Sequence, residues 1–162
     1  MVKKHHLAML YLVLCIPLTG LANELTTAGW LEKAMVLPQK LSIKAKLDTG
    51  AATTSINAQD PTFFQRDDEP WVRFDITNIN NETITIEEKI IREATIKRHF
   101  GKQQVRPVIM LEICIGNIRK TEEVNLVDRS NLNFQLLIGR NYLENALLID
   151  SGKTYQLELQ CS

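Results

Sequence analysis

The chain has 162 residues, and its 19 Lys and Arg side chains are balanced by 19 Asp and Glu side chains. This balance leaves no excess of positive charge for general nucleic-acid binding. The length suits one domain with a hydrophobic core of its own.

The N-terminus has the pattern of an export signal. Lys3 and Lys4 precede an apolar run over residues 7–18, and small residues end at Ala22. The apolar run is shorter than the roughly 20 residues that span a membrane comfortably. We therefore expect a signal peptide over residues 1–22, a periplasmic or secreted protein, and no stable membrane span after cleavage. An uncleaved anchor is the alternative.

The mature domain is expected to cover residues 23–162. Loss of Lys3 and Lys4 leaves 17 basic side chains against 19 acidic ones, a net charge near −2. Cys114 and Cys161 are retained. In an oxidising compartment they could form a disulfide, and two separate thiols are the alternative, because spacing does not show whether they meet.

Alternating apolar and polar residues predict the first strands. Residues 29–47 form two strands on either side of a turn at 38–40, and the alternation is clearest over residues 41–47. A β-branched return strand is expected at residues 53–56.

Residues 59–70 are polar and contain Asp-Pro and Asp-Asp-Glu-Pro turn signals, so we expect a loop there. An exposed acidic loop is the favoured interpretation of Asp67, Asp68 and Glu69, with metal binding as the alternative. Strands follow at residues 71–79, with Val72, Phe74 and Ile76 on one face, and at residues 83–91.

Residues 89–106 are strongly basic. They contain six Lys or Arg side chains and His99 against the single acid Glu93. Gly101 favours a hairpin tip at residues 99–102. One interpretation is a hairpin that attracts acidic peptides by charge complementarity. The alternative is a solvated edge hairpin whose charges prevent sheet-to-sheet aggregation.

The last third of the chain predicts strands at residues 106–116, 123–128 and 153–159, a buried strand before Gly139, and a short helix around residues 142–145. Many short strands with one short C-terminal helix indicate an all-β fold, a closed barrel.

Asp48 follows the strand at residues 41–47 and opens the sequence Asp-Thr-Gly-Ala. A carboxylate at the end of a buried strand must be hydrogen-bonded or functional, because an unpaired buried charge is costly. Gly50 permits a sharp turn, and the Thr49 hydroxyl can hold it. This arrangement suits an aspartic-protease loop that includes Ala51, and an ordinary strand-to-loop turn is the alternative.

Six segments occur in a specific order in this chain. They are residues 29–32, 45–51, 71–74, 106–108, 126–130 and 137–140. Together they resemble the RimB-type family of retropepsin-like peptidases, whose members are often labelled ATP-dependent zinc proteases. One departure is Ala52, where family members commonly carry a basic residue.

The resemblance implies a closed acid-protease barrel with Asp48 as the catalytic residue. A buried strand and helix start would lie beneath the catalytic loop, formed by Leu137, Ile138, Gly139, Arg140 and Asn141. Retropepsins also close over substrate with a hairpin flap. The basic stretch at residues 89–106 has the corresponding place in the order of this chain. The residues implied for the flap are Arg98, His99, Gly101, Lys102 and Arg106.

An aspartic peptidase needs two apposed carboxylates that share one proton. Asp-Ser-Gly at residues 150–152 is a candidate second motif, but only 10 residues follow it, so we interpret it as a β-turn. A C2 homodimer that pairs Asp48 with its symmetry mate is the better hypothesis. Arg140 would stay structural, and Asp128 and Asp150 are guesses for its partner.

Metal and nucleotide chemistry find little support. The mature chain holds one histidine, His99, and contains neither a His-Glu-x-x-His sequence nor a phosphate-binding Gly-x-x-x-x-Gly-Lys-Ser/Thr loop. We expect no cofactor and no metal.

The sequence therefore favours an exported, homodimeric aspartic endopeptidase. The resemblance to partners of glutamate-ligase systems implies acidic, glutamate-rich peptide substrates. A catalytically weak or inactive periplasmic peptide-binding module on the same fold is the alternative, and a purely structural dimer is a third hypothesis.

Overall fold

The computed structural model describes residues 25–96 and 103–161. The expected signal peptide and four expected flap residues, Arg98, His99, Gly101 and Lys102, lie outside this part of the chain. No helix within the described ranges has the length and apolar character needed to cross a membrane. The elements are β1 (Thr26–Leu37), β2 (Leu41–Leu47), β3 (Thr54–Asn57), β4 (Gln59–Arg66), β5 (Glu69–Thr77), β6 (Thr83–Lys89), β7 (Arg92–Ile96), β8 (Gln104–Ile115), β9 (Ile118–Val127), β10 (Leu136–Ile138), α1 (Arg140–Leu143) and β11 (Leu147–Thr154).

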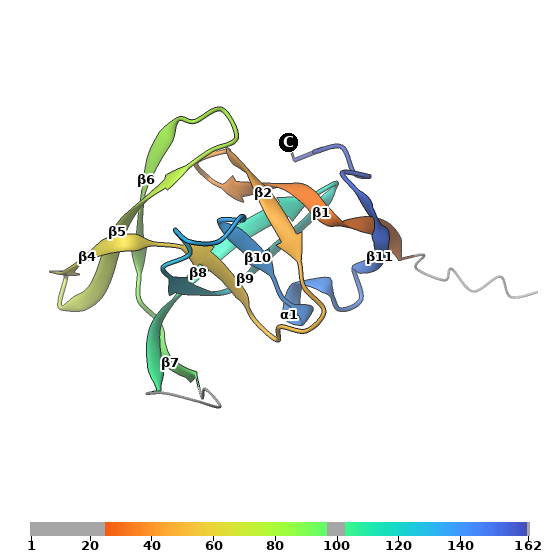
Figure 1. Ribbon diagram of the computed structural model, residues 1–162. Helices are drawn as coiled ribbons and strands as arrows, with labels where there is room; N and C mark the ends of the chain where they lie inside the picture. Colours follow the sequence, from red (N-terminus) through yellow and green to blue (C-terminus); the bar gives the residue numbers. More distant parts are fainter. Residues whose placement is uncertain (1–24, 97–102, 162) are drawn as a thin grey trace, which may run out of the picture.

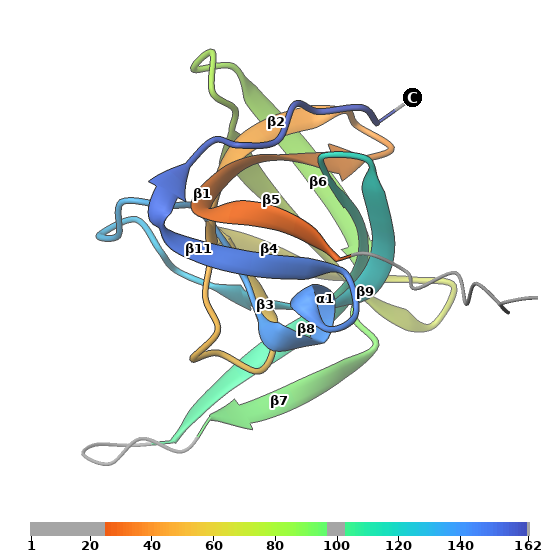
Figure 2. The same cartoon turned by 90° about the vertical axis from the view of Figure 1, so that its right-hand side faces the viewer.

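Six strands close into a barrel in the order β1-β2-β10-β3-β9-β8, and pairing of β8 with β1 completes the ring. β11 extends the sheet outside β1, and β7 extends it outside β8 (Figures 1 and 2). The all-β barrel with one short helix predicted from the sequence is confirmed.

Regular alternation drives the strands to bury one face. In β2, Leu41, Ile43, Ala45 and Leu47 are all at most 3% exposed, while the residues between them face outward. Because side chains alternate across a strand, the same register that fills the barrel also fixes where the following residue, Asp48, emerges.

A second sheet, of β4, β5 and β6, stands beside the barrel (Figure 1). Its inner face buries Val72, Phe74 and Ile76, as predicted. The prediction of a loop over residues 59–70 is wrong, because most of that stretch is β4, joined to β5 by a two-residue turn in which Asp67 and Asp68 both have positive φ.

Strand β4 lies at the edge of this sheet, and most of its residues are exposed. Its sequence therefore lacks the alternation that would predict a strand. Its outer face is held by stacking instead: the Arg66 guanidinium lies 4.3 Å from the Trp71 ring centroid and is paired with Glu87. The described part of the chain contains no group of three or more side chains suited to hold a metal.

The C-terminal region differs from its prediction. β11 runs parallel to β1 and already ends at Thr154, so the strand expected at residues 153–159 is wrong. The expected turn at residues 150–152 is instead a bulge within β11, where three residues face one on β1. Within it, the Gly152 N–H donates to Asp150 Oδ1 at 2.9 Å.

The segment after β11 is fixed across the barrel end by a buried acid and a disulfide. Glu32 is fully buried, and its carboxylate accepts from the backbone N–H groups of Gly29, Gln156 and Leu157 at 2.7–3.2 Å. Cys114 in β8 is bonded to Cys161, which confirms the disulfide alternative.

The disulfide should contribute measurably to stability. Cys161→Ser is expected to lower the free energy of unfolding by about 2–4 kcal/mol, because the bond closes a loop between residues 47 apart and so restricts the unfolded chain. Urea denaturation of the oxidised protein, the reduced protein and the variant measures this. Reduced protein should match the variant, and equal denaturation midpoints for all three samples would contradict the prediction.

Candidate active site

The loop that carries Asp48 is held by its own backbone. The Asp48 N–H donates to the Ile138 carbonyl at 2.9 Å, and the Ala51 N–H donates to the Asp48 carbonyl at 3.2 Å. The Gly50 N–H donates to Asp48 Oδ1 at 2.9 Å. The carboxylate is therefore oriented by the turn that the Asp-Thr-Gly-Ala sequence forms.

The strand and helix start predicted to lie beneath the loop do so. Arg140 N–H donates to the Ala51 carbonyl at 2.9 Å, and Asn141 N–H donates to the Ala52 carbonyl at 3.0 Å. A Cβ atom on Gly139 would lie 2.5 Å from the Thr53 carbonyl carbon, so only glycine permits this approach.

The Arg140 side chain also contacts the loop. Its Nη1 donates to the Thr49 carbonyl at 2.9 Å. The proposed partners Asp128 and Asp150 are wrong: Asp128 accepts from Ser130, and Asp150 pairs with Lys153. A carbonyl acceptor thus replaces the acid that the sequence led us to seek.

A second layer of polar contacts was not found from the sequence. The Gly139 N–H donates to Thr54 Oγ1 at 3.1 Å, and Thr54 Oγ1 donates to Glu122 Oε1. Asn125 Nδ2 donates to Thr53 Oγ1 at 2.7 Å. The signal available for this layer was Asn125, a polar residue within the otherwise apolar end of β9.

Asp48 stands beside cations. Partial burial raises the pKa of Asp48, but the Gly50 N–H, the nearby Lys46 ammonium and the Ala51 N–H together hold it below its ordinary value. Lys46 Nζ lies 3.3 Å from Asp48 Oδ2, and the Asp48 side chain is 26% exposed. In the described part of one chain, no second carboxylate pairs with Asp48.

The predicted basic hairpin has the stem expected of it. β7 and β8 pair antiparallel from Arg92–Val108 to Ile96–Gln104. Arg106 lies in β8, half-buried, and donates to Gln104 Oε1 through Nε and Nη2 at 3.2 and 2.8 Å.

Arg129 is a further cation of this site, and it was not singled out as a site residue. Burial lowers the pKa of Arg129, repulsion from Arg106 lowers it further, and attraction by Asp48 opposes both effects. Arg129 is therefore repelled by the charge of Arg106 and attracted by that of Asp48.

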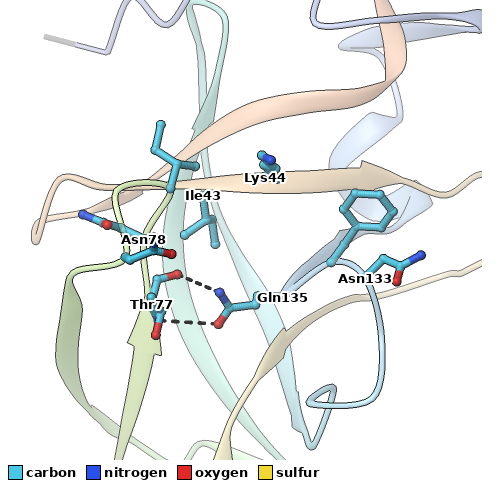
Figure 3. Close-up of a pocket in the computed structure, with 9 residues that line it drawn as sticks. Ile43, Lys44, Thr77, Asn78, Asn133 and Gln135 are labelled. Atoms are coloured by element: carbon cyan, nitrogen blue, oxygen red, sulfur yellow. Dashed lines mark hydrogen bonds between the residues drawn. The ribbon is translucent and has the colours of Figure 1, made fainter.

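Of two hollows in the surface, the first borders the Asp48 loop, and the lining of the second contains no residue of that loop. A groove of about 600 Å³ includes Thr49, Arg140 and the exposed Leu148. A smaller pocket of about 150 Å³ lies between β2, β5 and the loop that follows β9 (Figure 3). There the Gln135 amide donates to the Thr77 carbonyl at 2.7 Å, which ties that loop to the second sheet.

Gly139→Ala should destabilise the fold by about 3 kcal/mol or more, because the added methyl group meets backbone atoms that have little freedom to move. Gly152→Ala is the control, since its Cβ would meet only the Asp150 carboxylate, at 3.3 Å. Chemical denaturation of both variants tests this, and equal losses of stability would count against it.

Glu122 should make stability depend on pH. Burial raises the pKa of Glu122, partly offset by the Thr54 hydroxyl and Lys120. A raised pKa in the folded state contributes stability that is fully present below the pKa of the unfolded state, about 4.3. This stability is lost as the pH rises through the pKa of the folded state. The unfolding free energy of Glu122→Gln minus that of wild type should therefore increase from pH 4 to pH 8.

Glu123→Gln provides the matched contrast, because Arg92 lowers the pKa of Glu123. A lowered pKa makes wild type more stable as the pH rises, so the unfolding free energy of Glu123→Gln minus that of wild type should decrease over the same pH range. The decrease should be slight, because the pair of Arg92 and Glu123 is exposed and screened by solvent. Denaturation curves at several pH values measure both trends. A flat difference for Glu122→Gln would contradict the assignment.

Comparison with known proteins gives both sequence and structural relatives. Two relatives from Shewanella pealeana and Shewanella halifaxensis, each named "Probable alpha-L-glutamate ligase", are 34% identical over 119 and 122 residues, or 72% and 74% of this chain. The chain spans only about a quarter of their length, 26% and 27%.

A solved structure has the same fold. A Legionella pneumophila protein of unknown function matches with a TM-score of 0.68 and 28% identity, over 82% of this chain and 98% of that one. A family model described as "Retropepsin-like aspartic endopeptidase RimB" matches residues 27–158. The chain therefore belongs to the RimB-like family of retropepsin-like proteins.

Proposed function

We propose that this protein is an exported aspartic endopeptidase that works as a homodimer. The observation that carries the proposal is the Asp48 loop. Its carboxylate is oriented by the Gly50 N–H, and the loop carbonyls of Ala51 and Ala52 are held by the backbone around Gly139. This places one rigid carboxylate at the rim of the barrel.

The reaction needs a second carboxylate, which an identical chain supplies across a twofold axis. Two carboxyl groups in contact do not both ionise, so the pair holds one proton. The ionised member activates water, and the protonated member polarises the scissile carbonyl. The exposed Thr49 beside the apolar groove offers a surface on which two such loops meet.

We propose acidic, glutamate-rich peptides as substrates. Lys46, Arg106 and Arg129 give the surroundings of Asp48 a positive charge, which favours negatively charged peptides. The Shewanella relatives named as glutamate ligases support the same class.

The proposal of export rests on the signal pattern of residues 1–22. It is supported by the disulfide between Cys114 and Cys161, because such bonds form and persist in oxidising compartments.

A peptide-binding module without turnover is the second candidate. The ion pair between Lys46 and Asp48 favours it, because a neighbouring ammonium stabilises the ionised carboxylate and opposes the shared proton. Ala52, at a position where the family commonly has a basic residue, favours it as well.

Asp48→Asn is the test. Mature wild type and variant are incubated with acidic and mixed peptides, with and without a chelator, and products are read by mass spectrometry. Cleavage should occur with wild type alone and be indifferent to the chelator. Its rate per chain should fall on dilution, and excess Asp48→Asn should inhibit wild type by forming mixed dimers.

Cleavage that the variant retains but the chelator abolishes would overturn the proposal. A rate per chain that stays constant on dilution to nanomolar concentrations would contradict the shared dyad. Peptide that binds to both proteins and stays intact would favour the binding module.

A further inference from the structure

Arg129 is a buried cation whose hydrogen-bond partners among the described residues are all neutral. It is 8% exposed, and its guanidinium donates to the Phe134 carbonyl at 2.9 Å through Nε and to Ser55 Oγ at 3.2 Å through Nη1. Within residues 25–96 and 103–161, no carboxylate lies within ion-pair distance of it. Burial of a charge without a counter-charge is unfavourable.

A second guanidinium increases this cost. Arg106 is close enough that its charge lowers the pKa of Arg129, while Asp48 acts on the same group in the opposite sense. Contacts across the sheet place Arg129 on the same side as Asp48: it is bonded to Ser55, and Ser55 pairs with Leu137. Leu137 pairs in turn with Lys46, which contacts Asp48. Arg129 follows β9, and Arg106 lies in the stem of the β7–β8 hairpin. Like charges in this arrangement favour an anion near them.

The remaining nitrogen of Arg129 is available to such an anion. Nη2 makes no hydrogen bond to the residues that the structure describes, and it is not among their buried, unsatisfied polar atoms. Phe134 and Ser55 fix the plane of the guanidinium, so its outer donors point in a set direction. A planar fork of this kind matches the two oxygens of a carboxylate.

We propose that Arg129, assisted by Arg106, forms a subsite that binds a side-chain carboxylate of a peptide held beside Asp48. This inference rests on the proposed function, since it places the subsite beside the same carboxylate. It makes Arg129 a specificity-determining residue and assigns the preference for acidic substrates to a defined pair of side chains. The exposed lysines and arginines of the surface then contribute only general attraction.

Binding without turnover tests the subsite separately from catalysis. Two fluorescein-labelled decapeptides, alternating Glu-Ala and Gln-Ala, are titrated with mature Asp48→Asn protein, and the dissociation constants come from fluorescence anisotropy at fixed salt. The Glu peptide should bind about 10-fold tighter or more, as expected for charge-assisted pairs. Arg129→Lys and Arg106→Gln, each in the Asp48→Asn background, should reduce this ratio about 3-fold or more, since they remove the fork or a charge.

Arg92→Gln in the same background is the matched control. It also removes one positive charge from the hairpin stem, but Arg92 is exposed and paired with Glu123. It should leave the ratio of the two affinities nearly unchanged. A purely structural role for Arg129 predicts that Arg129→Lys weakens both peptides equally and leaves the ratio intact.

The outcomes separate this inference from the proposed function. A ratio that Arg106→Gln and Arg129→Lys leave unchanged, or no preference for the Glu peptide in Asp48→Asn protein, would overturn the subsite even if wild type cleaves peptides. A preference that falls in both variants but not in Arg92→Gln supports the subsite even if wild type cleaves none.

Discussion

The candidate site depends on one close approach, between the Asp48 loop and the backbone at Gly139. The bonds from Arg140 to Ala51 and from Asn141 to Ala52 require the two segments to touch without a side chain between them. Strand β10 is only three residues long, yet it pairs with both β2 and β3 and so fixes where the loop leaves the barrel. The position of the carboxylate is thus a property of the barrel closure rather than of the loop alone.

The charges of the site are arranged asymmetrically about this loop. The carboxylate of Asp48 forms an ion pair with Lys46 and also interacts electrostatically with Arg129. These cations favour the ionised form of Asp48 in a single chain, whereas the proposed peptide hydrolysis needs a shared proton. Approach of a second, identical loop would bring the missing negative charge, which raises the proton affinity of the pair. The electrostatics and the twofold hypothesis are consistent with each other.

Sequence patterns predicted those features that depend on local periodicity or on a specific turn. Alternation located β2 and β5, and the apolar run before Gly139 predicted a buried strand. The resemblance to retropepsins, not the local pattern, implied that this strand supports Asp48. Strand β4 was not predicted, because an edge strand that is exposed on both faces has no alternation of apolar and polar residues. The contacts of Glu122 and Arg129 were not predicted, because they form only when β9 pairs with β3 and β8. No short sequence motif encodes this long-range pairing.

The base of the β7–β8 hairpin is anchored to the second sheet as well as to the barrel. Only two residues separate β6 from β7, and both are anchored: Ile90 N–H donates to the Pro70 carbonyl and Ile91 N–H to the Val108 carbonyl, at 2.8 and 2.9 Å. The second sheet is tied in turn to the loop after β9 by Gln135. The base of the hairpin is therefore attached to β5 and to β8 at adjacent residues. The second sheet thus acts as a brace between the base of the hairpin and the loop that follows β9.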